Sequence, residues 1–209
     1  MKKIETYGNL ISNIPVDFQS ATVKKSNWSR FNSELVNNVF GKESEIEISR
    51  IDVKKESDIE KKIVLTLMWG YPSGGRGRHI QNILDNLDGL KKVFQRYREK
   101  RIDKGTADNL IKEFITIKGL GVSTWSKLLY FFGYEIDFCK CQIYDEKIVA
   151  SLNKKQFSIM NDKIWVHTSK EYYNYIRFLD DISKKFLNHE SLDKIELFFF
   201  YFNLGYKFT

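Results

Sequence analysis

The chain has little proline and little cysteine, and each shortage excludes a class of protein. With 2 prolines among 209 residues, long stretches are free to form helices. The two cysteines, Cys139 and Cys141, are too few for a disulfide framework, an all-cysteine zinc site or a four-cysteine iron–sulfur cluster. We therefore expect reduced thiols in a cytoplasmic protein.

Long apolar runs are also missing. The longest, "LFFFYF" at residues 197–202, is far shorter than the ~20 residues that a membrane-spanning helix needs. The first residues, "MKKIETYGNLISN", lack the apolar centre of a signal peptide. These features predict a protein with no membrane partner.

Several enzyme motifs are absent as well. The sequence has no phosphate-binding P-loop, dinucleotide-binding glycine fingerprint or serine nucleophile elbow. Its three histidines, His79, His167 and His189, do not have the spacing of metal ligands. We expect neither a metal nor another cofactor.

Positive charge is present in excess. Lysine and arginine outnumber aspartate and glutamate by 34 to 27, which gives a formal net charge of +7. This balance favours a polyanionic partner such as nucleic acid, although a lysine-rich soluble surface has the same composition. Charge alone therefore does not decide between the two.

The hydrophobic pattern predicts an all-α protein. The sequence shows no repeat and no linker, so we expect a single domain over residues 1–209. The glycine-rich "GYPSGGRGRH" at 70–79 is the clearest loop, and the charged stretch from Gly41 to Ser57 is expected to be a loop or a short strand edge. Helices are expected over residues 27–39, 57–69, 80 onward, 104–114, 122–133, 145–152, 169–187 and 191–202.

Two of these helices flank a glycine hairpin. In "IKGLG", Gly119 and Gly121 bracket Leu120 and let the backbone turn without a Cβ in the way. Exposed amides at the start of the next helix, near Ser123, are suited to phosphate. The segment 104–133 has the pattern of a helix-hairpin-helix, which binds the DNA backbone without reading its sequence, but a plain helix corner has the same pattern.

The helix after the hairpin is amphipathic on a helical wheel. Ser123 and Lys127 lie together on one arc. The opposite arc is apolar and consists of Trp125, Leu128, Leu129 and Phe132. We therefore expect Lys127 to face away from the apolar side and to be exposed.

The motifs "IKGLG", "SKLLYFFGYE" and "IYDEKI", with "MWGYPSGGRGRHIQNIL" before them, resemble the helix-hairpin-helix DNA glycosylase superfamily. More narrowly, they are similar to bacterial 8-oxoguanine DNA glycosylase-like proteins. The resemblance covers residues 60–150 best. It implies two helical lobes around a cleft, with Lys127 as the nucleophile and Asp145 as the assisting carboxylate.

Those two residue types suit the reaction that the resemblance implies. A lysine amine that attacks C1′ of the sugar forms a Schiff base, after which β-elimination can nick the strand. A carboxylate stabilises the positive charge that develops on the sugar as the base leaves. Asp145 also has the position of an N-cap for the helix that follows it, and the two roles are compatible.

The position of the lysine departs from the superfamily pattern. In most members the lysine follows the hairpin at the place of Ser123, whereas Lys127 lies one helical turn later, ~6 Å along the same face. Two alternatives to an 8-oxoguanine glycosylase stay open. One is a DNA-binding protein that keeps the hairpin without the chemistry, and the other is a glycosylase for a different modified base, such as one in phage DNA.

The glycine-rich loop supplies the remaining candidates. Arg76, Arg78 and His79 are suited to phosphate contact or to filling the space that an extruded base leaves. Trp69 and Tyr71 could stack on such a base, although burial in the core is the commoner fate of such rings. The expected partner is duplex DNA with a modified base, bound by a monomer without an obligate protein partner.

Overall fold

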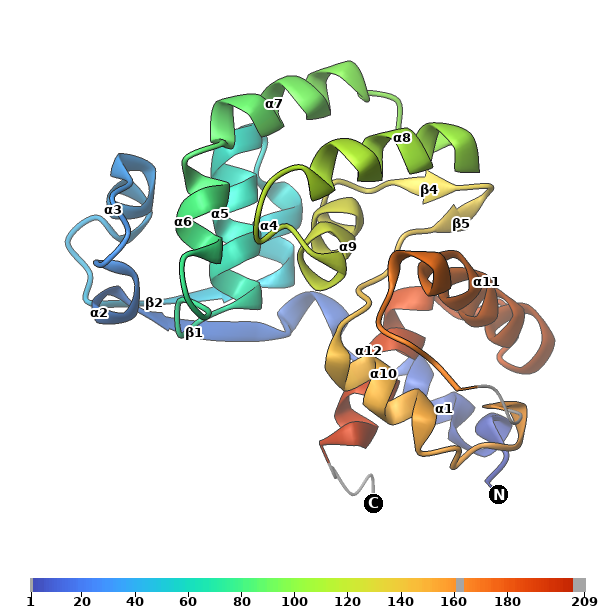
Figure 1. Ribbon diagram of the computed structural model, residues 1–209. Coiled ribbons are helices and arrows are strands. Elements are labelled where there is room, and N and C mark those ends of the chain that lie inside the picture. Colours follow the sequence, from blue (N-terminus) through green and yellow to red (C-terminus); the bar gives the residue numbers. More distant parts are fainter. Residues whose placement is uncertain (1, 161–163, 205–209) are drawn as a thin grey trace. The chain divides into compact units, whose positions relative to one another are not determined.

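The computed structural model describes residues 2–160 and 164–204 (Figure 1). The chain forms two compact units. The central unit is Asp17–Phe138, and the terminal unit combines the residues up to Val16 with those from Cys139 onward. Each unit is described separately.

The central unit is helical with two small sheets. Strand β1 (Ser20–Lys24) pairs antiparallel with β2 (Glu45–Ser49), and β3 (Arg101–Ile102) pairs parallel with β4 (Glu135–Ile136). Its helices are α2 (Lys25–Trp28), α3 (Glu34–Phe40), α4 (Arg50–Lys55), α5 (Ile59–Gly70), α6 (His79–Leu84), α7 (Leu87–Arg96), α8 (Lys104–Ile115) and α9 (Val122–Phe131).

Helix α5 is central to this unit. Asp58 caps it by accepting a hydrogen bond at Oδ1 from the Lys61 amide at 2.8 Å. Its apolar residues are buried without a break from Ile63 to Met68, and α5 packs against α7, α9 and β1 (Figure 1). The region that carries the hairpin is therefore built on a buried helix.

The terminal unit joins the two ends of the chain. It contains a 3₁₀ helix (Ile4–Tyr7), α1 (Gly8–Ser12), β5 (Cys139–Lys140), α10 (Glu146–Asn153), a second 3₁₀ turn (Ser158–Met160), α11 (Ser169–Phe186) and α12 (Leu192–Asn203). A further 3₁₀ turn, Val16–Phe18, lies at the unit boundary. Helix α12 packs against α1, α10 and α11, and its residues Ile195 and Leu197 to Phe199 are buried.

The mostly helical prediction is confirmed, and so are the helices at 57–69, 104–114, 122–133, 145–152, 169–187 and 191–202, each within about two residues. Purely all-α is too strong, because β1 and β2 pair along their whole length. None of the helices in the described residues is both long and apolar enough to cross a membrane.

Two predicted helices are each interrupted, and a third local prediction was only partly right. The helix expected at 27–39 is two helices, because the amide of Asn32 donates to Gln81 Oε1 at 3.0 Å and Ser33 caps a new helix. The helix expected from residue 80 breaks between α6 and α7. The charged segment expected as a loop or short strand edge does contain a strand, β2, but it also contains the unexpected helix α4, whose first turn is fixed by a capping box of Ser49 and Asp52.

Candidate active site

The hairpin between α8 and α9 lies against the start of α6. Gly119 has φ +105°, a backbone conformation that favours glycine. A Cβ at Gly119 would lie 2.7 Å from both Cα and Cβ of His79 and 2.8 Å from the His79 carbonyl oxygen. The hairpin and the end of the glycine-rich loop are therefore in direct backbone contact, which brings Gly119 and His79 together.

Gly121 has different surroundings. It is the N-cap of α9 with φ −75°, and nothing lies within 4 Å of the position that a Cβ would take. The geometry of the turn therefore requires glycine at Gly119 and not at Gly121. Within the described residues the amides of Val122 and Ser123 donate to no acceptor. The first turn of α9 is therefore open to an acceptor from outside the chain.

Lys127 is buried, and the expectation that it is exposed was wrong. Only 4% of the residue is accessible to solvent. Helix α9 is buried all along its length from Thr124 to Phe131, so the polar arc of the wheel is covered as well as the apolar one. Gly70, at the end of α5, provides the space, because a Cβ there would lie 2.9 Å from Lys127 Cδ.

The amine of Lys127 turns back along the helix to Ser123. Its Nζ donates to Ser123 Oγ at 2.8 Å and to the Ser123 carbonyl oxygen at 3.1 Å. Side chains on a helix point toward its N-terminus, and the Lys127 amine therefore lies beside Ser123, one helical turn earlier.

Tyr71 belongs to the same group of side chains. Its hydroxyl is 2.7 Å from Thr124 Oγ1 and 3.5 Å from Ser123 Oγ. Lys127 Nζ lies 5.5 Å from the centre of the Tyr71 ring, within the range of a cation–π contact. Tyr71 thus connects the glycine-rich loop to α9 next to the amine.

Trp69 is placed differently. Its ring packs edge-on against Phe131, with centroids 5.2 Å apart, and the guanidinium of Arg50 lies 5.2 Å from it. Its Nε1 donates to the Gln19 carbonyl oxygen at 3.2 Å. Trp69 is therefore engaged in packing with its neighbours, whereas Tyr71 borders the amine.

The glycine-rich loop exposes its cationic residues. Arg76, Arg78 and His79 are all exposed, and within the described part of the chain the two guanidinium groups make no hydrogen bond or ion pair. Behind them the loop is fixed, because Arg30 donates to the carbonyl oxygens of Gly74 at 2.7 Å and Gly75 at 2.9 Å. The loop therefore presents charge from an anchored backbone.

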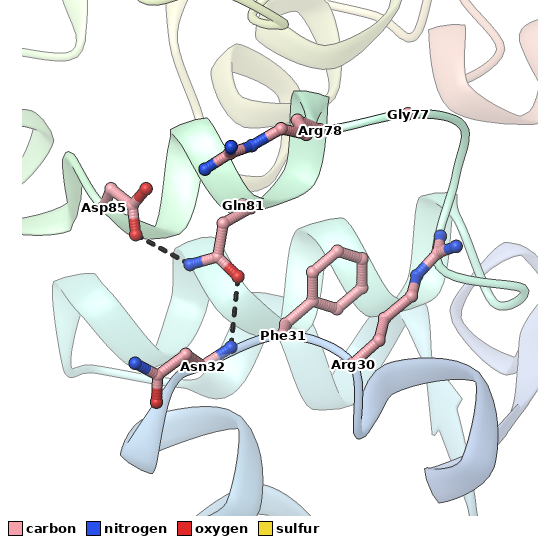
Figure 2. Close-up of a pocket in the computed structure, with 7 residues that line it drawn as sticks. All are labelled: Arg30, Phe31, Asn32, Gly77, Arg78, Gln81 and Asp85. Atoms are coloured by element: carbon pink, nitrogen blue, oxygen red, sulfur yellow. Dashed lines mark hydrogen bonds between the residues drawn. The ribbon is translucent and has the colours of Figure 1, made fainter.

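Arg78 also lines a pocket of about 460 Å³ in the central unit. Figure 2 shows its guanidinium beside Gln81, whose amide joins two parts of the wall. Gln81 Nε2 donates to Asp85 Oδ1 at 2.7 Å, and Gln81 Oε1 accepts from the Asn32 amide. The remaining lining residues are Arg30, Phe31 and Gly77.

Asp145 lies in the terminal unit, at the start of α10. Its Oδ1 accepts hydrogen bonds from the amides of Lys147 at 3.0 Å and Ile148 at 3.1 Å. The N-cap prediction for Asp145 is confirmed. These two bonds fix the orientation of the carboxylate relative to the helix.

Cys139 and Cys141 are both buried, and neither forms a disulfide within the described residues. Residues 2–160 and 164–204 contain no group of three or more histidine, cysteine, aspartate or glutamate side chains that could hold a metal.

Two neighbours of the amine were not predicted from the sequence. Gly70 leaves room for the Lys127 stem, and Thr124 orients Tyr71. For Gly70 the sequence did contain a signal of close packing, because it is a glycine at the end of an otherwise apolar helix. Nothing in the sequence indicated Thr124.

The family model described as "Putative 8-oxoguanine DNA glycosylase OGG-like protein" matches residues 14–200. No curated protein and no solved structure matches the chain significantly.

Proposed function

From the premise that the chain belongs to the OGG-like family of 8-oxoguanine DNA glycosylases, we propose that it excises 8-oxoguanine or a chemically related modified base from duplex DNA. We further propose that it does so by lysine attack and then nicks the abasic strand. The observation that carries this proposal is the buried amine of Lys127 at the Ser123 position.

The location of this amine supports a nucleophilic role. A nucleophile has to be held in a defined position before it attacks, and only 4% of Lys127 is accessible to solvent. The hydroxyl and the carbonyl oxygen of Ser123 both accept hydrogen bonds from Lys127 Nζ, and these two bonds orient the amine. To reach a sugar, Nζ has to leave these acceptors while the stem stays against Gly70.

The proposed reaction has two stages, release of the base and cleavage of the strand. The Lys127 amine forms a bond to C1′ as the bond from C1′ to the base breaks, and the base leaves with the bonding pair. The attacking nitrogen, now positively charged, releases a proton, which the base takes up. The nitrogen lone pair then breaks the bond from C1′ to O4′, which takes up a proton from water, and the opened sugar is a protonated Schiff base. Loss of a C2′ proton then expels the 3′ phosphate. Asp145 is proposed to stabilise positive charge on the sugar in the first step.

DNA contact is proposed to come from the hairpin and the loop. Helix α8, residues 116–121 and α9 would act as a helix-hairpin-helix, with the Val122 and Ser123 amides directed at a phosphate. The exposed Arg76 and Arg78 would contact neighbouring phosphates.

Borohydride trapping tests the proposal. Purified protein is incubated with three labelled duplexes, one with 8-oxoguanine, one with an abasic site and one undamaged, and the covalent adduct is quantified. We expect adducts on the first two and their loss in Lys127→Gln, with Lys118→Gln in the hairpin as the matched control.

The pattern of adducts separates the alternatives. A Lys127-dependent adduct on the abasic duplex alone would keep the lyase and assign a different base. Binding without any adduct or base release would contradict the enzyme and leave a DNA-binding protein.

A further inference from the structure

The segment that leads into Asp145 is attached to the rest of the terminal unit through its backbone. Residues 141–144 are buried and lie between β5 and the start of α10. Three consecutive carbonyl groups in this segment, those of Gln142, Ile143 and Tyr144, accept hydrogen bonds from side chains elsewhere in the unit. A run of side-chain donors on successive carbonyls is unusual, since most buried carbonyls are satisfied by backbone amides.

Two of the donors come from α11. Tyr172 donates its hydroxyl to the Gln142 carbonyl at 3.1 Å, and Tyr175 donates to the Ile143 carbonyl at 3.0 Å. Both rings are buried, and burial holds the pKa of Tyr172 well above its ordinary value. Its phenol therefore keeps its proton, and can donate it, at pH values where an exposed tyrosine would begin to ionise.

The third donor is His167. Its Nε2 lies 3.0 Å from the Tyr144 carbonyl oxygen. A carbonyl oxygen only accepts, so Nε2 carries the proton in this contact. Tyr144 in turn donates its hydroxyl to the Val166 carbonyl at 3.0 Å. The segments around residues 144 and 167 are thus joined in both directions.

The same segment around Trp165 also fixes the far end of α10. Asn153 donates Nδ2 to the Trp165 carbonyl at 2.9 Å, and its Oδ1 accepts the Trp165 amide at 2.8 Å. Helix α10 is therefore attached before its first residue and at its last. Asp145, which caps α10, therefore lies between two attached points of the chain, the carbonyl groups of residues 142–144 and the side chain of Asn153.

We propose that Tyr172, Tyr175 and His167 are positioning residues for the Asp145 carboxylate. This inference rests on the proposed function, because it assigns a purpose to the precise placement of Asp145. A carboxylate that stabilises developing charge has to be held before the reaction, and a displacement of about 1 Å can reduce the rate ~100-fold. The three donors restrict the backbone that carries the carboxylate, and the α10 cap restricts its side chain.

Loss of the donors alone tests this role. In the double variant Tyr172→Phe with Tyr175→Phe, both rings stay and only the two hydroxyl groups are lost. We expect single-turnover release of the modified base to fall roughly tenfold or more, with duplex affinity within about twofold of wild type. Tyr134→Phe is the matched control, because its hydroxyl donates to a backbone carbonyl, that of Tyr97, in the central unit.

Replacement of His167 gives a second, independent readout. His167→Gln keeps an NH donor near the Nε2 position and should retain most of the rate, whereas His167→Leu should lose it. All rates are measured well below each variant's Tm, so that loss of folded protein does not contribute. Recovery of the rate by glutamine with no difference in Tm between the two variants would support positioning.

The outcomes separate this inference from the proposed function. Rates within twofold of wild type in both the double variant and His167→Leu, with Lys127→Gln inactive, would overturn positioning and leave the function intact. An equal fall in Tyr134→Phe would also overturn it. Full activity of Lys127→Gln would instead contradict the proposed function itself.

Discussion

Gly119 and Gly121 are two positions apart, yet the structure places different demands on them. Alanine at Gly119 would have a positive φ, and its Cβ would lie 2.7 Å from both Cα and Cβ of His79. Neither of these atoms can move aside by a side-chain rotation. Alanine at Gly121 would enter open space at φ −75°. The residues therefore form a natural pair for comparison.

We predict that Gly119→Ala destabilises the protein by about 1–3 kcal/mol and weakens DNA binding. Gly121→Ala should leave stability within about 1 kcal/mol of wild type. Urea unfolding and duplex titration of both variants provide the measurements. Equal stability of the two variants would contradict the described contact between the hairpin and α6.

Lys100 carries a pH-dependent contribution to stability. Burial, with Lys62 as a second cause, lowers its pKa to about 8. Its Nζ lies 4.1 Å from the centre of the Tyr134 ring and 5.5 Å from that of Phe132. The pKa of Lys100 in the folded state is below its value in the unfolded state, so burial of the charged amine lowers the free energy of unfolding. This loss of stability is complete below pH 8 and decreases as pH rises toward 10.

We predict that Lys100→Met is more stable than wild type at pH 7, by about 1 kcal/mol after allowance for solvent screening. The advantage should shrink between pH 8 and pH 10, because the folded wild type then loses its proton. Lys92→Met, at an exposed position paired with Asp88, should show no such trend. A difference in Tm that stays constant across this pH range would count against the burial of the amine.

The burial of Lys127 shows where a helical wheel fails. The wheel correctly grouped Lys127 with Ser123, and the hydrogen bond between them confirms that pairing. It could not show that Gly70 and Tyr71 cover the polar arc, because they belong to a different element. Coverage by another element is a tertiary property that the periodicity of one helix does not contain.

At the scale of elements, the helices with clear caps were predictable and the interrupted ones were not. Asp145 and the apolar spacing after it defined α10. The break between α2 and α3 depends on the contact of Asn32 with Gln81, 49 residues away. Helix α4 does have a local sequence signal, since Ser49 and Asp52 form a capping box. The charged residues around this box were interpreted as a loop or strand edge instead.

The loop between α5 and α6 yields a prediction about salt. Arg76 and Arg78 are exposed and have no ion pair within the described residues, so each is available to a phosphate. We predict that Arg76→Gln and Arg78→Gln each reduce the slope of log K against log salt concentration by about 1. Fluorescence anisotropy with a labelled duplex at several salt concentrations measures this slope.

Arg101→Gln is the matched control for that experiment. Its guanidinium already pairs with Glu135 Oε2 at 3.0 Å, so its replacement should leave the slope unchanged. A slope that does not change in either loop variant would contradict the proposed role of the loop in DNA contact.

At the scale of the whole molecule, the charge and the family point to the same partner. A net charge of +7 favours a polyanion, and the family that matches residues 14–200 is one of DNA glycosylases. The motifs from residue 60 to 150 were sufficient to indicate this family from the sequence. The boundaries of the two units were not indicated, since the terminal unit joins chain ends with no common sequence signal.

Peptide mapping of the borohydride-trapped adduct tests the central claim most directly. The reduced complex on an 8-oxoguanine duplex is digested with nuclease and protease, and the sugar remnant is located by mass spectrometry. The proposed mechanism predicts the remnant on Lys127. A remnant on another lysine would contradict this assignment, and the absence of any remnant despite base release would contradict lysine attack altogether.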